Sequence, residues 1–330
     1  MPLRTAPLPR MAGDLTFMRS RRATLEELNA ENLAILGTPV EDNVGRKSGT
    51  RFAPTALRET SVYFGWHANP QFSHPVDIDV RVPIDTSEMH DRLVDIGDIP
   101  LEGVPAETAA TSIGTVMNEA RRSGASIILL GGDDSIVEPA IANAGERQPV
   151  GFLQIGGRVP AGEPANTGAG TTPRCPLGTL LTSGVIVPPT TAVLAAPGRI
   201  GWEFAESFRS SGGRIWTASE VSRAPAGRIE RLARDIADDV GPLNVHFDVS
   251  AIRASLHGMS EHPKFGALNL PDLQKTLGEL GRVPVASLIV TGLNPTLSGL
   301  SVVKTGLRLT VTALLAYIYS RLGLEAAKQS

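Results

Sequence analysis

Residues 129–139 read LLGGDDSIVEP, and this stretch decides how the rest of the chain is interpreted. An apolar run typical of a buried strand leads into two glycines, two aspartates and a serine at which a helix can begin. In α/β proteins such a junction brings side chains to the carboxyl edge of a parallel sheet, where ligands and catalytic groups gather. We therefore expect Asp133 and Asp134 to lie at a functional edge.

Apolar, strand-like runs alternate with helical patterns through most of the chain, which is typical of a parallel sheet covered on both faces. The patterns predict a three-layer α/β/α domain with a mainly parallel central sheet. The expected strands are 31–37, 125–131, 150–155, 191–196, 214–219, 243–249 and 285–290, and the expected helices begin at Pro54 or cover 106–122, 135–145, 201–211, 225–240, 271–280 and 301–322.

No linker-like change of composition divides this pattern, so we predict one domain over residues 25–330. Residues 1–24 are rich in proline and arginine and predict a flexible arm that becomes helical only near Thr24. The segment 156–189 is rich in glycine, proline and threonine and shows little periodicity. A segment of that length inside a compact domain is usually a functional or mobile loop, and we expect it to lie over the edge that carries Asp134.

Composition excludes several classes of protein. The net charge of −3 gives no basic surface for nucleic acid or an anionic membrane. The apolar runs are shorter than a membrane span, and the first residues lack the apolar core of a signal peptide, so a cytoplasmic protein is expected. Cys175 is the only cysteine, which excludes an intramolecular disulfide and a cysteine-based zinc site.

Four stretches, in this order, resemble conserved segments of the ureohydrolase family, which includes arginase and agmatinase. They are GTPVEDNVGRKSGTRFAPTALRETS (37–61), DIGDIPL (95–101), GGDDS (131–135) and GALNLPDLQKTLGELGRVPVASLIVTGLNP (266–295). The resemblance implies the arginase/deacetylase-like fold and a homo-oligomer, either a trimer or a hexamer. It also implies a hydroxide that two manganese ions hold and that attacks a guanidinium carbon.

The metal ligands that the family would supply are mostly replaced. In the first motif Asp133 matches the family's aspartate, but Asp134 stands where the family has a histidine ligand. In the second motif Gly156, Arg158 and Pro160 stand at the family's Asp, His and Asp; a register shifted by two residues puts Gln154, Gly156 and Arg158 there instead. Neither register supplies a set of metal ligands.

The third motif, VHFDVSAIRAS (245–255), keeps only one of three carboxylates. Asp248 matches the first aspartate, whereas Ser250 and Arg253 replace the second and third. Gly292 stands where the family has the glutamate that binds the guanidinium group, and Ala169 where a loop has histidine. We expect no dinuclear metal site and no cofactor; one weakly bound ion on Asp133, Asp134 and Asp248 is the alternative.

The residues expected to line the former metal pocket are Asp133, Asp134, Gly156, Arg158, Asp248, Ser250, Arg253 and Gly292, and the catalytic candidates are Asp134, Asp248, His246 and Arg158. We expect the Arg158 guanidinium to pair with Asp134 or Asp248, which would otherwise be uncompensated buried charges. His246 has two interpretations: an acid or base near Asp248, or a strand histidine held by a neighbouring side chain. The second is the favoured one.

Three hypotheses follow for function. The first is a pseudoenzyme of the ureohydrolase fold that binds a small ligand or a partner and does not hydrolyse arginine or agmatine. The second is a metal-independent enzyme that uses Asp134, Arg158 and Asp248 on another small substrate, with 156–189 as a lid. The third, a retained manganese-dependent amidinohydrolase, is the least favoured.

Overall fold

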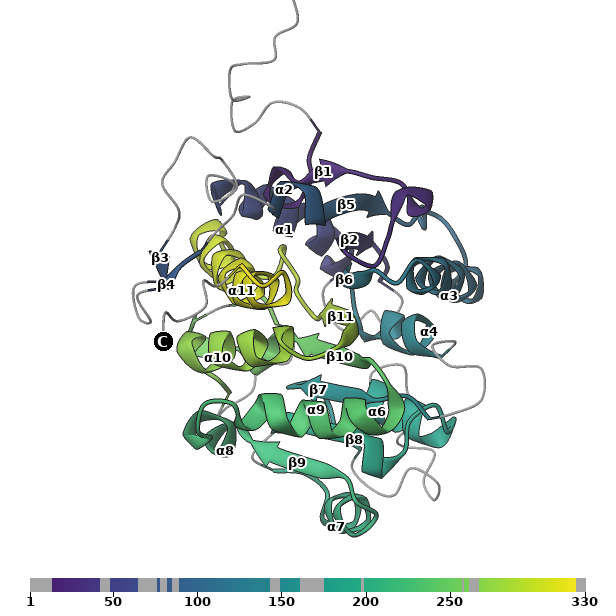
Figure 1. Cartoon of the computed structure of the whole chain (residues 1–330), viewed down its shortest axis with the longest axis vertical. Helices are drawn as coiled ribbons and strands as arrows, with labels where there is room; N and C mark the ends of the chain where they lie inside the picture. The colour runs from purple at the N-terminus through teal and green to yellow at the C-terminus, as the bar shows by residue number, and fades with distance from the viewer. Residues whose placement is uncertain are drawn as a thin grey trace, which may run out of the picture.

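The computed structural model describes residues 14–41, 48–64, 76–77, 82–84, 89–142, 149–160, 175–196, 199–256, 258–260 and 267–324. Its centre is a nine-stranded sheet in the order β1-β5-β2-β6-β11-β10-β7-β8-β9 (Figure 1). Every neighbouring pair in this sheet is parallel. The predicted fold class is therefore confirmed.

The strands of the main sheet are β1 (Arg21–Arg22), β2 (Leu33–Thr38), β5 (Leu93–Asp98), β6 (Ser126–Gly131), β7 (Phe152–Ile155), β8 (Thr191–Ala196), β9 (Arg214–Thr217), β10 (Leu243–Asp248) and β11 (Val285–Thr291). A short antiparallel pair, β3 (Val76–Asp77) and β4 (Val82–Pro83), lies outside it. The α-helices are α1 (Ala53–Ser61), α2 (Met89–Arg92), α3 (Ala106–Arg122), α4 (Val137–Ile141), α6 (Pro176–Thr182), α7 (Trp202–Ser210), α8 (Ala218–Arg223), α9 (Arg228–Val240), α10 (Leu270–Gly281) and α11 (Leu300–Arg321).

Helices cover both faces of the sheet, because alternate residues of each buried strand point to opposite sides. In β11, Leu288 and Val290 pack into the apolar cluster formed with α1, α8, α9, α10 and α11. The residue between them, Ile289, packs into a second cluster with α3, α4, α6 and α7. The polar side chains described below lie on the second face, at the ends of the central strands.

The last helix, α11, is the one described helix long and apolar enough to cross a membrane by length and composition. In this protein, however, it packs on α10 and α1, and Val311, Leu314 and Ile318 are fully buried in the first cluster. Buried core helices of globular proteins have the same composition. Its apolar character is thus explained by the core.

The folded domain begins earlier than expected, so the predicted arm over residues 1–24 was wrong for residues 14–24. β1 pairs with β5, and Phe17 and Met18 are buried. The Asp95 carboxylate accepts a hydrogen bond from the Phe17 backbone N–H at 2.8 Å and pairs with Arg58 at 2.8 and 3.0 Å. This buried ion pair fastens the first residues to α1 and β5.

The segment 156–189 is also less open than its composition suggests. Residues 176–182 form α6, whose Leu177 and Leu180 are fully buried against the second face of the sheet. The prediction of a structureless loop was wrong for this half. Residues 161–174, including Ala169, lie outside the described residues.

Candidate functional site

Asp134 reaches the carboxyl edge of the sheet through a tight turn after β6. A Cβ at Gly132 would meet the Val40 carbonyl oxygen, so only glycine fits where these two backbones touch. Asp133 caps the following 3-10 turn: its Oδ1 accepts hydrogen bonds from the backbone N–H and the hydroxyl of Ser135, at 3.0 and 2.5 Å. Asp133 therefore shapes the turn, and Asp134 is the aspartate that faces the neighbouring strands.

Three side chains from three adjacent elements form a hydrogen-bonded chain at this edge. The Thr291 hydroxyl, at the end of β11, donates to Asp134 Oδ1 at 2.7 Å. His246 Nε2, from β10, lies 2.8 Å from the same hydroxyl and 3.6 Å from Asp134 Oδ1. Since the hydroxyl proton goes to Asp134, the Thr291 oxygen accepts from His246, which assigns the proton to Nε2.

This environment acts on the charge of Asp134. Burial opposes its ionisation, but the hydrogen bond and charge of His246, the Thr291 hydroxyl and the charge of Arg158 outweigh burial and hold the pKa of Asp134 below its ordinary value. Asp134 is consequently a carboxylate at neutral pH. It therefore acts here as a hydrogen-bond acceptor and a negative charge. To act as a proton donor, Asp134 would need a raised pKa.

His246 is fully buried, and its second ring nitrogen, Nδ1, has no hydrogen-bond partner among the described residues. The favoured interpretation, a strand histidine held by a neighbour, is supported by the contact with Thr291. The carboxylate at 3.6 Å is that of Asp134, whereas we expected Asp248. On the other side of β10 the register partner of His246 is Gln154 in β7, whose buried Oε1 also has no partner in the described part of the chain.

Asp248 ends β10 and caps the next turn, because its Oδ1 accepts from the Ser250 backbone N–H at 2.7 Å. Ser250 is buried, and its hydroxyl has no partner in the described part of the chain. Gly292 follows Thr291 with φ of 77°, and a Cβ there would lie 3.0 Å from Asp248 Oδ1. The Asp248 carboxylate thus occupies the space in front of position 292.

Gly156 lies at the end of β7 with φ of 73°, a conformation that favours glycine. A Cβ built there would lie 2.6 Å from Ala251 Cβ and 2.9 Å from Ala251 N. The turn after Asp248 therefore packs directly on position 156. No carboxylate side chain fits at 156 unless this turn moves.

Arg158 and Arg253 lie differently from expectation. Arg158 is half-buried and its charge lowers the pKa of Asp134, but no direct ion pair joins it to Asp134 or Asp248 in the described structure. Its backbone carbonyl accepts a hydrogen bond from Gln154 Nε2 at 2.9 Å, which holds the turn after β7. Arg253 is exposed, and the described structure gives it no contact with Asp134 or Asp248.

These residues do not fit a dinuclear metal centre. Within the described residues no three His, Cys, Asp or Glu side chains are grouped closely enough to hold a metal ion. Asp133 and Asp248 use an oxygen to cap turns, and Asp134 is bonded to Thr291. Divalent manganese needs several oxygen or imidazole ligands that converge at short distance.

Thr291 was not among the predicted site residues, and Gln154 was named only at a metal-ligand position in the shifted register. Both are polar residues in otherwise apolar strands, and Gln154 is fully buried. A buried polar residue near the end of a parallel strand is the signal that points to both of them. Four neighbouring strands or the turns after them, β6, β11, β10 and β7, thus contribute Asp134, Thr291, His246 and Gln154 in spatial order.

Comparison with known proteins assigns the fold to a family. The model of the Arginase family matches residues 31–316, which is most of the chain. The chain belongs to the arginase family. A curated relative, the guanidinopropionase of Pseudomonas aeruginosa, is 21% identical over 295 residues, covering 89% of this chain and 88% of the relative.

Solved structures agree with this arginase-family fold. Formimidoylglutamase of Bacillus subtilis superposes with a TM-score of 0.73 at 18% identity, with 98% of this chain and 96% of that chain covered. Proclavaminate amidino hydrolase of Streptomyces clavuligerus gives a TM-score of 0.71 at 20% identity, over 95% and 99% of the two chains. Such low identities establish a shared fold and leave the reaction open.

Proposed function

We propose that this arginase-family protein works without the dinuclear manganese centre and does not hydrolyse guanidino compounds. It is a ligand- or partner-binding pseudoenzyme that retains the fold and has replaced the centre with a hydrogen-bonded network. Asp134, Thr291 and His246 form that network at the edge where the metal ions would lie.

The single observation that carries the proposal is the backbone at Gly156. The family resemblance puts a metal ligand at this position, an aspartate in the first register and a histidine in the register shifted by two residues. Here the positive φ and the contact with Ala251 leave no room for any side chain. The loss of a ligand side chain at position 156 is therefore accompanied by close packing of the turn against it. Restoring that one side chain would not recreate the metal site.

An activity assay tests the proposal. The protein is incubated with Mn²⁺ and with arginine or agmatine, and urea is measured, with an active amidinohydrolase assayed in parallel. We expect no urea above the blank. Metal-dependent turnover of either substrate would overturn the proposal.

A second function, metal-independent catalysis, is favoured by one observation. A buried histidine connected through a hydroxyl to an ionised carboxylate is a unit that can take up and hold a proton. His246 would be the base, Asp134 would stabilise its protonated form, and Arg158 would bind an anionic part of the substrate. In this case the pocket would act on a substrate other than a guanidino compound.

The two functions can be separated with chelator-treated protein. A panel of amide, ester and amidine substrates is offered to the wild type, to Asp134→Asn and to the exposed control Asp235→Asn. Turnover that Asp134→Asn abolishes and Asp235→Asn leaves intact would favour the enzyme. No turnover with any variant favours the binding protein.

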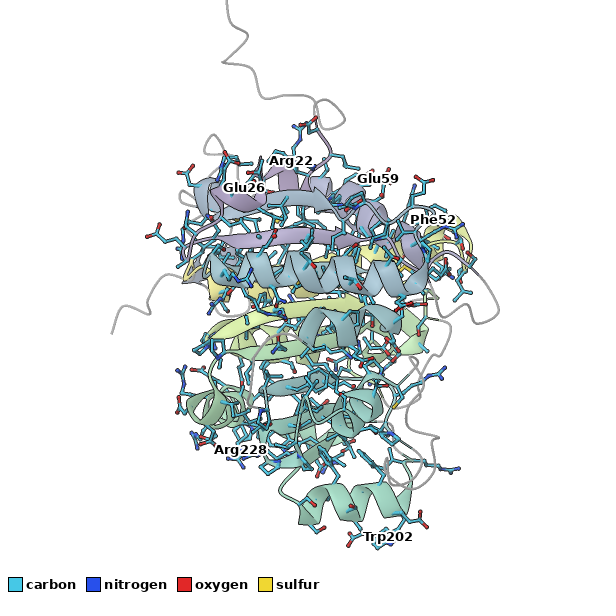
Figure 2. All side chains as sticks on the ribbon, turned by 90° about the vertical axis from the view of Figure 1, so that its right-hand side faces the viewer. Arg22, Glu26, Phe52, Glu59, Trp202 and Arg228 are labelled. Atoms are coloured by element: carbon cyan, nitrogen blue, oxygen red, sulfur yellow. The ribbon has the colours of Figure 1, made fainter. Side chains whose placement is uncertain are left out.

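We further propose a cytoplasmic homo-oligomer, a trimer or hexamer, on the family resemblance. Large apolar side chains on the surface include Trp202, 75% exposed on α7, and Phe52, 48% exposed before α1. Figure 2 shows Phe52 at the upper right of the molecule and Trp202 at its lower end, so they do not form one patch. Light scattering of the purified chain would give the subunit number.

A further inference from the structure

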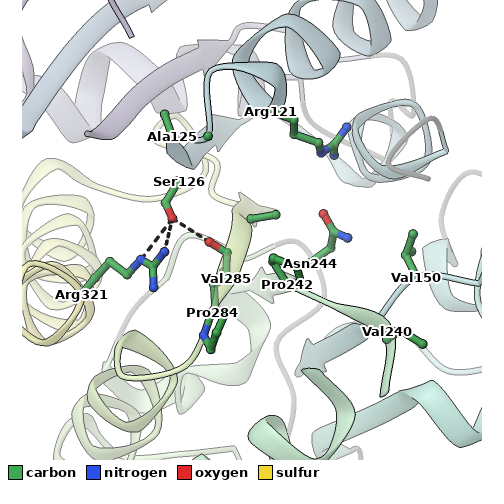
Figure 3. A pocket seen from close by; sticks show the side chains of 12 residues that line it. Arg121, Ala125, Ser126, Val150, Val240, Pro242, Asn244, Pro284, Val285 and Arg321 are labelled. Carbon is green, nitrogen blue, oxygen red and sulfur yellow. Dashed lines mark hydrogen bonds between the residues drawn. The ribbon is translucent and has the colours of Figure 1, made fainter. Parts of the chain in front are cut away.

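A polar cavity lies at the amino edge of the sheet, away from Asp134. It has a volume of about 280 Å³ and lies between the first residues of three neighbouring strands (Figure 3). Ser126 begins β6, Val285 begins β11, and Asn244 is the second residue of β10. Asp134 follows the opposite end of β6, so this cavity is separate from the candidate site.

Arg321, the last residue of α11, enters the cavity from one side (Figure 3). Its Nε and Nη2 donate to the Ser126 hydroxyl at 3.1 and 2.6 Å, and its Nη1 donates to the Val283 carbonyl at 3.1 Å. The Ser126 hydroxyl in turn donates to the Val285 carbonyl at 2.7 Å. The guanidinium is therefore fixed in place, and two of its five N–H donors remain unused by the described residues.

Arg121, in the last turn of α3, reaches the cavity from another side (Figure 3). Its Nη1 donates to Asn118 Oδ1 at 3.2 Å, its Nη2 donates to the Ala140 carbonyl, and its buried Nε has no partner in the described structure. No carboxylate pairs with it there. Burial without a counter-charge lowers the pKa of Arg121 to about 10.

The residues that line the cavity indicate which kind of ligand would compensate the two guanidinium charges. Among the residues that the structure describes, twelve line the cavity and none of these is acidic, so the described lining supplies no anion to either guanidinium. The remaining walls are largely apolar and include Val150, Val240, Pro242, Pro284 and Val285. Two guanidinium groups separated by apolar walls are complementary to a short aliphatic chain that carries a carboxylate at each end.

We propose that the cavity between Arg121 and Arg321 binds a short aliphatic dicarboxylate, which places a small-molecule binding site at the amino edge of the sheet. One carboxylate accepts from the unused Arg121 donors, the other from those of Arg321, and the aliphatic stem lies on the valines and prolines. Because this site shares no residue with the candidate site at Asp134, the proposal is independent of the proposed function.

Calorimetric titration with succinate and glutarate tests this site, with succinamide and butyrate as probes of the same length that lack both or one of the charges. We expect saturable binding of a dicarboxylate, binding of butyrate at least about tenfold weaker, and none of succinamide. Binding of succinamide equal to that of succinate, or no binding of either dicarboxylate at millimolar concentration, would overturn the proposal.

Two matched variants locate the site. Arg121→Gln removes one guanidinium from the cavity, and Arg122→Gln removes the same charge from the exposed neighbouring position on α3. We expect about ten- to hundredfold weaker dicarboxylate binding in Arg121→Gln and an unchanged affinity in Arg122→Gln. Equal losses in both would show a non-specific charge effect and contradict the site. The probe series on the wild type decides the question even if Arg121→Gln is unstable.

Discussion

At Gly156 the crowding that excludes a metal-binding side chain can be tested by measuring the free energy of unfolding. Gly156→Ala adds a Cβ in a left-handed conformation and against Ala251, so we expect a loss of about 2–5 kcal/mol in the free energy of unfolding. Gly184→Ala is the matched control, because φ there is 72° and nothing lies within 4 Å of the added atom. It should lose only about 1–2 kcal/mol. Equal losses in urea denaturation would mean that position 156 is not crowded.

Thr291 connects His246 to Asp134, and its hydroxyl can be removed at nearly constant shape. Thr291→Val leaves the buried His246 N–H and one Asp134 oxygen without this partner, which should cost about 1–3 kcal/mol of unfolding free energy. Thr291→Ser keeps the hydroxyl and should lose about 1 kcal/mol or less, from the missing methyl group. Should the two variants unfold at the same urea concentration, the hydrogen-bonded chain would contribute nothing.

Asp134 makes stability depend on pH in a definite direction. Its pKa in the folded protein is lower than in the unfolded chain, so its contribution is fully present above the unfolded value of about 3.9 and is lost as pH falls through the lower folded value. The difference in unfolding free energy between wild type and Asp134→Asn should be constant above about pH 5 and shrink in more acidic solution. A difference that grows on acidification would contradict the lowered pKa.

At this scale the sequence predicts which residues reach the edge, but not which of them touch. Asp134 and Asp248 could be placed because Asp134 follows a strand and Asp248 ends one. The contact of His246 with Thr291 could not be predicted, because it depends on β11 lying between β6 and β10. The sequence of a single strand does not determine which strands lie beside it. Arg158 failed as an ion-pair partner for a similar reason, since the turn after β7 is held through its backbone carbonyl.

Among the elements, α9 depends on a carboxylate from α10. Glu279 is buried, and its side chain accepts hydrogen bonds from the backbone N–H groups of Gly227, Ile229 and Glu230, at 2.9, 2.9 and 3.1 Å. These are the unpaired donors of the first turn of α9, and an anion there is also favoured by the helix dipole. The contact fixes where α9 begins and how it lies on α10.

Glu279→Ala should therefore lower the unfolding free energy by about 2–4 kcal/mol, because several buried N–H groups lose their acceptor. Glu230→Ala is the control: Glu230 lies in the first turn of the same helix but pairs with Arg234 and Arg282 near the surface. It should lose about 1 kcal/mol or less. Thermal or urea unfolding measures both, and a control as unstable as Glu279→Ala would refute the cap.

Long periodic elements were predicted closely, whereas β1 and β5, at one side of the sheet, were missed. The predicted helix 106–122 and strand 191–196 coincide with α3 and β8. β5 was missed as a strand because two aspartates and a glycine interrupt the apolar residues of LVDIGD. Asp95 is fully buried there only because Arg58 pairs with it from α1, and such tertiary compensation does not appear in local periodicity.

For the whole molecule, the layers were predictable because alternation of strands and helices allows few arrangements. Polar groups lie at both edges of the sheet, because the backbone and side chains leave the apolar core where the strands begin and end. The carboxyl edge carries the network around Asp134, and the amino edge carries Arg121 and Arg321. The fold is that of the arginase family, while the chemistry depends on what each edge binds.

Manganese content tests the central claim most directly. The protein is stripped with chelator, equilibrated with excess Mn²⁺, freed of unbound metal by gel filtration and analysed by elemental mass spectrometry. We predict that no stoichiometric manganese remains with the chain, because Asp133, Asp134 and Asp248 are committed to turn caps and to Thr291. Retention of about two manganese ions per chain, the number that a two-metal hydrolase requires, would contradict the account.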